Sequence, residues 1–202
     1  ALTVAENDEQ KAVIEKLIKY YCSGSLEDFD DYCIAWVGDL DSRIDFVNGF
    51  TESYGDPLGM KASWESIVNF KDLEATKRTE TISSNAQWFE DNSPVDSRFK
   101  KEKVKGVTAK VITAAILAGD LYPSTAIGIN LPNSNWIRSA HGSKSVTIGN
   151  LTEAYNMAAL GNGFNEEFVY SDVERKLLEE YDALTGDLHT DLHECLGHGS
   201  GQ

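Results

Sequence analysis

The 202-residue sequence has no apolar run that approaches the roughly 20 residues of a membrane span. It is also poor in basic residues: it has 18 lysines and arginines but 33 aspartates and glutamates, which gives a net charge of −15. A protein that neutralises phosphates needs a basic face, so this balance argues against nucleic acid as a partner. Internal repeats, low-complexity tracts and a glycine-rich phosphate loop are absent as well. An ordinary globular protein is the class that remains.

Cysteine is scarce too, with three in the chain, Cys22, Cys33 and Cys195. An odd number without metal-ligand spacing favours reduced thiols and a cytoplasmic protein. A disulfide between Cys22 and Cys33 remains an alternative from the sequence. However, Cys33 falls on the apolar face of a predicted helix, where a free thiol packs well.

The hydrophobic period alternates between 3.6 residues and two along the chain, which predicts a mixed α/β (α+β) fold. The strongest sheet signal is a β-hairpin, whose two strands are separated by a turn at residues 55–59. Strands are expected over residues 43–54, 64–70, 103–112 and 127–129. Helices are expected over residues 10–21, 26–36, 72–90, 151–160 and 171–184. The stripe of the second helix contains Leu26, Phe29, Cys33 and Trp36.

Beyond Gly161 the pattern becomes purely helical, and we place a boundary there. Residues 1–160 form a mixed α/β region, and residues 161–202 form a helical segment. Ser171 and Glu174 make a capping box at the start of a helix that Thr185–Gly186 is expected to end. Asp187 is then expected to cap a last, separate helix. The apolar stripe of the capped helix consists of Tyr170, Val173, Leu177, Tyr181 and Leu184.

The strongest chemical signal is the stretch HECLGH at residues 193–198. Two imidazoles bracket a carboxylate that directly follows the first of them. Zinc hydrolases hold their metal with two histidines in this way, while a glutamate activates the metal-bound water. The stretch therefore predicts a Zn²⁺ site with His193 and His198 as ligands and Glu194 as the base.

The spacing of the two histidines requires a distorted helix. The second histidine falls at i+5, and on a regular helix five residues advance about 140° past a full turn, so His193 and His198 would point apart. A π-bulge absorbs one extra residue, and Gly197 can relax the helix at that point, so we predict a π-bulge. His189 and His193 share a face at i,i+4, but no carboxylate follows His189. A surface helix end that carries two histidines without a metal is the remaining alternative.

HECLGH and the Gly-Ser-Gly that follows it resemble HExxGH, the signature of the dipeptidyl peptidase III family of zinc exopeptidases. Two upstream stretches are similar to the same family: NGFTESYGDPLG at residues 48–59 and GINLPN at residues 128–133. HGSKSV at residues 141–146 is a weaker fourth block. The four blocks occur in the family's order between residues 48 and 198.

The resemblance implies a zinc-dependent exopeptidase that releases dipeptides from the N-terminus of short peptides. Glu52 would bind the free ammonium of the substrate, and Tyr54 would hydrogen-bond the carbonyl oxygen as negative charge develops on it. Asn130 and Asn133 would hold the substrate backbone in an extended pose. Pro132 fixes the chain between them, which predicts an open corner displaying both amides, although an ordinary Asn-Pro turn is an alternative.

The resemblance also implies two lobes that face a cleft. The hairpin and the asparagine corner would belong to a β-rich lobe, and the terminal helices to a helical, catalytic lobe. In the family the third zinc ligand is a glutamate on a downstream helix, which this sequence lacks, so we expect a fragment of a bacterial-type member. Two rival functions remain open from the sequence: a non-catalytic acidic peptide-binding module, and a zinc endopeptidase that accepts blocked N-termini.

Overall fold

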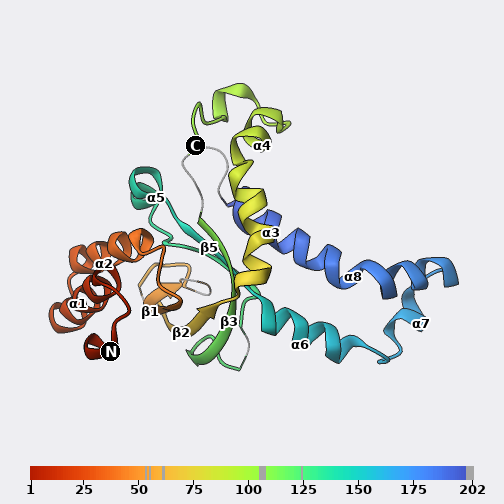
Figure 1. Cartoon of the computed structure of the whole chain (residues 1–202), viewed down its shortest axis with the longest axis horizontal. Coiled ribbons are helices and arrows are strands. Elements are labelled where there is room, and N and C mark those ends of the chain that lie inside the picture. The colour runs from red at the N-terminus through yellow and green to blue at the C-terminus, as the bar shows by residue number, and fades with distance from the viewer. Residues whose placement is uncertain (53, 55, 61, 105–107, 124, 199–202) are drawn as a thin grey trace.

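A sheet of five strands lies at the centre of the computed structural model, in the part of the chain that the structure describes (Figure 1). The described residues are 1–52, 54, 56–60, 62–104, 108–123 and 125–198. The strand order is β1-β2-β3-β5-β4, and among these strands β3 and β5 form the one parallel pair. The bounds are β1 (Ile44–Glu52), β2 (Ser63–Lys71), β3 (Thr108–Gly119), β4 (Gly128–Leu131) and β5 (Lys144–Ile148).

The described helices are α1 (Asp8–Ser23), α2 (Leu26–Gly38), α3 (Leu73–Ser84), α4 (Ala86–Asn92), α5 (Asn135–His141), α6 (Gly149–Ala159), α7 (Phe164–Phe168) and α8 (Asp172–Leu192). Short 3₁₀ turns lie at η1 (Leu2–Val4) and η2 (Ser97–Phe99), and a π-helical turn, η3 (His193–Gly197), directly follows α8. These elements confirm the predicted mixed α/β (α+β) fold and the predicted hairpin. The division near residue 161 stays a prediction. None of the described helices is both long and apolar enough to cross a membrane.

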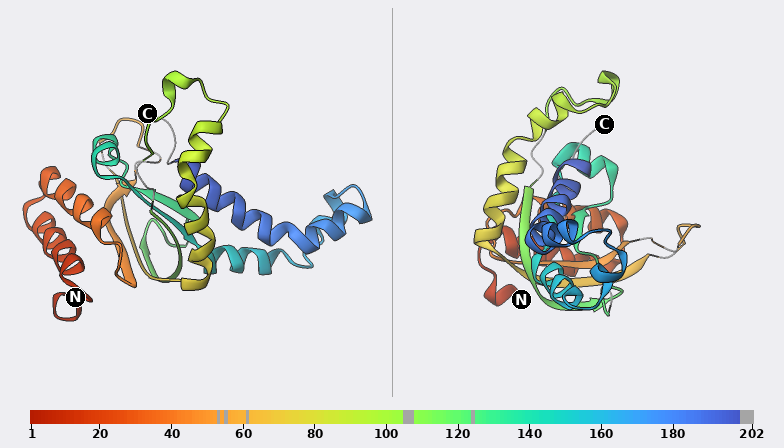
Figure 2. Two further views of the ribbon diagram at one scale, coloured as in Figure 1. Left: turned by 45° about the horizontal axis from the view of Figure 1, so that its top comes forward. Right: turned by 90° about the vertical axis from the view of Figure 1, so that its right-hand side faces the viewer.

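Helices α1 and α2 pack together against one face of the sheet, and this contact forms the main core (Figures 1 and 2). Its buried side chains include Trp36, Ile67, Ile112 and Ile148. Ser25 caps α2 by accepting a hydrogen bond from the backbone amide of Glu27. The expectation for Leu26 was wrong, because this first helical residue is 76% exposed.

The sheet curls strongly enough for side chains of two distant strands to meet. Lys144 of β5 lies 3.1 Å from Asp45 of β1, although β2 and β3 separate these strands in the sheet order. The indole nitrogen of Trp36 donates to the same carboxylate, and the Lys144 ammonium lies 4.4 Å from the centre of the Trp36 ring. Lys144 is fully buried. This buried ion pair therefore links β1 to β5 across one face of the sheet.

A second, smaller core lies where α3, β3 and η3 meet. Ile82, Ala109 and Cys195 are buried there, and Leu192 and Leu196 pack against them. Burial raises the pKa of the Cys195 thiol to about 12. The other two cysteines, Cys22 and Cys33, are also free, so the alternative disulfide between them is not formed in this structure.

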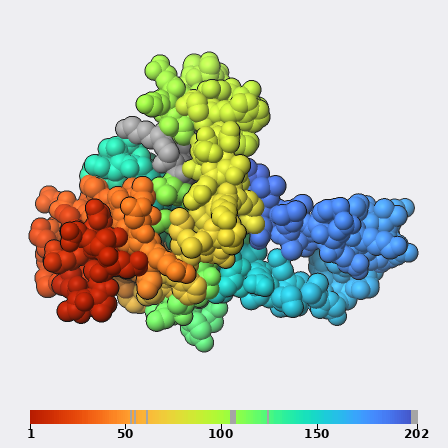
Figure 3. Space-filling model, viewed as in Figure 1, coloured from red at the N-terminus to blue at the C-terminus, as the bar shows by residue number. Residues whose placement is uncertain are grey.

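Helices α6, α7 and α8 form an arm that projects away from the sheet (Figures 1–3). The predicted apolar stripe of α8 lies in this arm, but its side chains are exposed, Tyr170 by 96% and Leu177 by 52%. The predicted break at Thr185–Gly186 was also wrong, since α8 continues through it. The Thr185 hydroxyl donates to the carbonyls of Tyr181 and Asp182, so it is satisfied inside the helix. A single helical glycine costs only about 1 kcal/mol relative to alanine, which the rest of a long helix offsets.

Candidate metal centre

The metal motif lies where α8 ends against the sheet. Ser171 and Glu174 form the predicted capping box at the start of α8, and the helix runs from there directly into η3. Within η3 the amide of His198 donates to the carbonyl of His193 at 3.0 Å, which is an i to i+5 bond. The spacing of HECLGH predicted this π-helical distortion, and the structure confirms it.

The π turn brings the two imidazoles onto one side. The ring centres of His193 and His198 lie 4.8 Å apart with planes at 88°. One potential ligand atom each from His193, Glu194 and His198 forms a group in which all lie within 4.8 Å of one another. The alternative partner, His189, does not belong to this group of described residues. Burial, His193 and Arg138 together hold the pKa of His198 below its ordinary value.

Glu194 is the buried member of the group, with 5% of its surface exposed. Its Oε2 atom has no hydrogen-bond partner among the described residues. Burial raises the pKa of its carboxyl above the ordinary value, against the opposing effect of His193. The carboxylate lies against the main chain of β4, because a Cβ atom on Gly128 would meet its Oε1 at 2.4 Å. A buried carboxylate with one unpartnered oxygen beside two imidazoles fits a cation or a water molecule at this place.

Polar contacts from three other elements hold the turn. The Ser145 hydroxyl of β5 donates to the carbonyl of Glu194 at 2.7 Å, and the Thr147 hydroxyl donates to Asp191 at 2.8 Å. Arg78 of α3 pairs with the same Asp191 carboxylate. Arg138 of α5 donates to the carbonyl of His198. Sequence reasoning missed these partners, because no local pattern links residues as much as 113 positions apart.

Two of the predicted substrate-binding residues meet. The Asn133 side-chain amide donates to the carbonyl of Thr51 at 3.0 Å and to the Glu52 carboxylate at 3.1 Å, across 81 positions of sequence. Glu52 is half-buried. Burial raises the pKa of its carboxyl, although the Asn133 hydrogen bond acts in the opposite direction. A carboxylate held in this way is a fixed anionic point at the end of β1.

The structure places the other two predicted residues differently. Tyr54 is 87% exposed, and Ser53 and Gly55 on either side of it lie outside the described residues. The open corner predicted for Asn130 was wrong, because this residue lies inside β4 and is buried. Its amide nitrogen donates to the hydroxyls of Ser143 and Ser145. Pairing of β4 with β5 turns this side chain inward, toward the strand that supports the metal motif.

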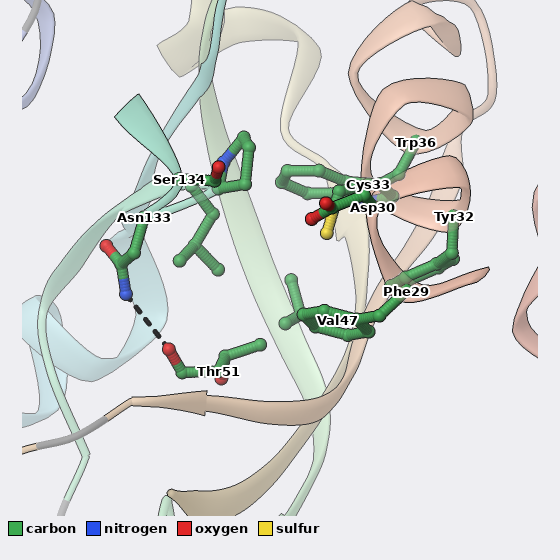
Figure 4. A pocket seen from close by; sticks show the side chains of 11 residues that line it. Phe29, Asp30, Tyr32, Cys33, Trp36, Val47, Thr51, Asn133 and Ser134 are labelled. Carbon is green, nitrogen blue, oxygen red and sulfur yellow. Dashed lines mark hydrogen bonds between the residues drawn. The ribbon is translucent and has the colours of Figure 1, made fainter. Parts of the chain in front are cut away.

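A small cavity of about 90 Å³ lies between α2, β1 and residues 131–134 (Figure 4). Its wall is mostly apolar, with Phe29, Trp36 and Val47 among the lining side chains. The Asn133 to Thr51 hydrogen bond lies at its polar side (Figure 4). The cavity therefore adjoins the Glu52–Asn133 pair.

Comparison with known proteins gives one family. The family model described as "Peptidase family M49" matches residues 1–202 of the chain. "Dipeptidyl peptidase 3" of Dictyostelium discoideum is 31% identical over 204 aligned positions, which cover all of this chain and 28% of that protein. A protein of Arabidopsis thaliana called "Nudix hydrolase 3" is 32% identical over 169 positions, covering 83% of this chain and 21% of that protein.

Solved structures agree on the fold. The structure of DPP III from Caldithrix abyssi superposes with a TM-score of 0.80 at 23% identity, covering 99% of this chain and 37% of that one. At 23% identity this superposition is evidence for the fold alone. The chain spans 28% of the length of the Dictyostelium relative. These relatives are therefore considerably longer than the chain described here.

Proposed function

The chain belongs to peptidase family M49, and from this premise we propose that the protein containing it is a zinc-dependent dipeptidyl peptidase. It would release dipeptides from the free N-termini of short peptides in the cytoplasm. One observation carries the proposal: the π turn gathers two imidazoles and a buried carboxylate within 4.8 Å. A surface helix end with two unrelated histidines would not need a buried glutamate with an unpartnered oxygen beside them.

The donor set suits zinc. Imidazole nitrogens are ligands that zinc prefers, and the two histidines come from one helix end. His193 and His198 would hold the ion. A catalytic zinc site uses three protein ligands and keeps one open position, and we propose that the third ligand comes from a part of the protein outside this chain. When bound, zinc acts as a Lewis acid that acidifies water and polarises a carbonyl group.

Glu194 would then move the proton. Its carboxylate is buried beside the two histidines and has a free acceptor atom among the described residues. It would accept a proton from the attacking water and pass it to the leaving amine. Because Gly128 leaves space for this carboxylate, the main chain of β4 would fix where the proton is taken up.

Glu52 would make the enzyme an exopeptidase by pairing with the substrate ammonium. The Asn133 hydrogen bond keeps its carboxylate in place, and Asn133 would also hold the substrate main chain. Two residues of extended peptide span about 6.6 Å, so cleavage after two residues needs Glu52 at roughly that reach plus side-chain length from the zinc. Tyr54 would stabilise the developing oxyanion. Asn130 would contribute to backbone binding only through its Oδ1 atom, which has no hydrogen-bond partner among the described residues, because its amide nitrogen is already bound to Ser143 and Ser145.

Metal binding by the full-length protein tests this proposal. We expect one zinc per chain in the wild type and in Glu194→Gln, but much weaker zinc binding in His193→Ala and His198→Ala. Glu194→Gln should lose activity while keeping the metal, since it lacks only the proton acceptor. Equal zinc content in all four proteins would contradict the assignment. Peptide binding that is indifferent to chelators and to Glu194→Gln would instead support the non-catalytic acidic module.

A further inference from the structure

Strand β5 carries two buried hydroxyl groups that face the metal motif. Residues of a strand alternate between its two faces, and Val146 and Ile148 point into the main core beneath α1 and α2. Ser145 and Thr147 therefore point to the opposite face, where α8 ends, and they are 1% and 3% exposed. Ala109, the partner of Ser145 in the parallel register, belongs to the small core around Cys195.

Each hydroxyl donates to the helix end at a different point. Ser145 reaches the carbonyl of Glu194 inside the π turn at 2.7 Å. Thr147 reaches the side chain of Asp191, two residues before His193, at 2.8 Å. Asn130 of β4 supports the first contact by donating to the Ser145 hydroxyl at 2.7 Å. The two contacts lie on either side of His193.

Asp191 receives a second partner from outside the sheet. Its carboxylate is fully buried and is shared between Thr147 and Arg78. Arg78 lies on α3, which crosses the end of α8, and it also lies 3.3 Å from Asp187, one turn earlier (Figure 1). The helix end is thus attached to β5 on one side and to α3 on another.

Because the metal motif lies on a single helix end, rotation or sliding of that end would move both imidazoles together. A shift of one residue along the helix turns a side chain by about 100°, so a small rotation of this helix end would point the imidazoles away from the metal site. Two hydroxyls with fixed spacing on a strand set both the rotation and the height of the turn. Partners that hydrogen-bond directly to metal ligands usually account for about 10- to 100-fold in metal affinity, and these two hydroxyls act one contact further out, so we expect the lower end of that range.

We propose that Thr147 and Ser145 are positioning residues for the metal centre, Thr147 acting through Asp191 and Ser145 through the Glu194 carbonyl. The inference rests on the proposed zinc site, but it concerns residues that neither bind the ion nor touch substrate. Without these contacts, the two histidines would still be present but would no longer be held in a fixed position relative to the proposed third ligand. The effect should therefore appear in metal affinity rather than only in stability.

The test compares isosteric variants of the full-length protein. Thr147→Val removes the hydroxyl and keeps the shape, whereas Thr147→Ser keeps the hydroxyl. Thr76→Val is the matched control, because the Thr76 hydroxyl is also buried and links α3 to the main chain of Val111 through two hydrogen bonds. Zinc affinity is measured by competition with a chromophoric chelator, and thermal stability is measured on the same samples.

We expect Thr147→Val to weaken zinc binding about tenfold, and Thr147→Ser to restore affinity to within a factor of about two. Thr76→Val should lower the melting temperature at least as much and leave zinc affinity unchanged. Ser145→Ala is a second, independent variant, and its zinc affinity should fall as well. Wild-type affinity in both Thr147→Val and Ser145→Ala would overturn the inference, as would an equal loss in Thr76→Val. Absence of zinc binding in the wild type would instead refute the proposed function.

Discussion

Substitution of Gly128 by alanine tests the position of the proposed proton acceptor. An added Cβ would lie 2.4 Å from Oε1 of Glu194 and 2.8 Å from its Cδ, whereas ordinary contact begins at 3.4 Å. Gly128 does not adopt a left-handed backbone conformation, so the conflict is one of space alone. The carboxylate or the strand must therefore shift by about 1 Å, and misplacement by 1 Å can cost about 10²-fold in rate.

We therefore expect Gly128→Ala to reduce kcat about 10²-fold in the full-length protein, which corresponds to about 2.7 kcal/mol of transition-state stabilisation. Overpacking should lower the free energy of unfolding by about 1–3 kcal/mol. The assay is the steady-state rate of dipeptide release, with zinc content and urea denaturation measured in parallel. Gly186→Ala is the control, because its Cβ meets nothing within 4 Å in α8, and it should leave kcat unchanged.

A double-mutant cycle keeps this prediction decisive if Gly128→Ala is poorly active for another reason. Glu194→Asp shortens the acid by one methylene group and vacates part of the contested space. The cost of Gly128→Ala should then be smaller in the Glu194→Asp background than in the wild type. Wild-type kcat in Gly128→Ala, or strictly additive losses in the cycle, would refute the placement of the carboxylate against β4.

Three further predictions concern other parts of the chain. Glu52→Gln should lower kcat/KM for unblocked peptides, and the loss should correspond to about 2–5 kcal/mol of binding energy. Steady-state kinetics measure this loss, and the zinc content should stay unchanged. An unchanged kcat/KM would favour an endopeptidase. Lys144→Met should destabilise the fold by about 3–5 kcal/mol in urea denaturation, because it leaves Asp45 buried without its cation; wild-type stability would contradict this. Lys110→Met should stabilise by about 1–3 kcal/mol at neutral pH, because burial lowers the pKa of an ammonium that has no hydrogen-bond partner among the described residues. The cost of burying the Lys110 ammonium is fully present below the lowered pKa of the folded protein, and it disappears as the pH rises toward the ordinary lysine pKa. The stability gained by Lys110→Met should therefore shrink in alkaline solution.

The sequence was sufficient for features that depend on local periodicity. Helix α1, the hairpin of β1 and β2, and the capping box at Ser171 each follow from residue spacing over one or two turns. The π turn belongs to the same class, because an i+5 histidine pair can converge only if the helix absorbs one residue. The short helix α5 was not predicted, since seven residues give too little periodicity.

Features that depend on tertiary contacts could not be predicted. The α8 stripe reads as an ordinary amphipathic helix, yet this chain leaves its side chains exposed. Nothing local shows that the sheet curls until Lys144 reaches Asp45. Asn130 was expected at an open corner because Pro132 follows it, but pairing with β5 takes precedence and buries its amide. The Asp191 contacts with Arg78 and Thr147 likewise exist only because α3 and β5 meet at the end of α8.

The most direct test of the central claim is the product formed by the zinc-loaded, full-length protein from a short peptide with a free N-terminus, identified by mass spectrometry. The account predicts that dipeptides are released stepwise from the N-terminus, that an N-acetylated copy of the peptide stays intact, and that Glu194→Gln releases nothing. Internal cleavage of the acetylated peptide, or an intact free peptide in the presence of bound zinc, would contradict it.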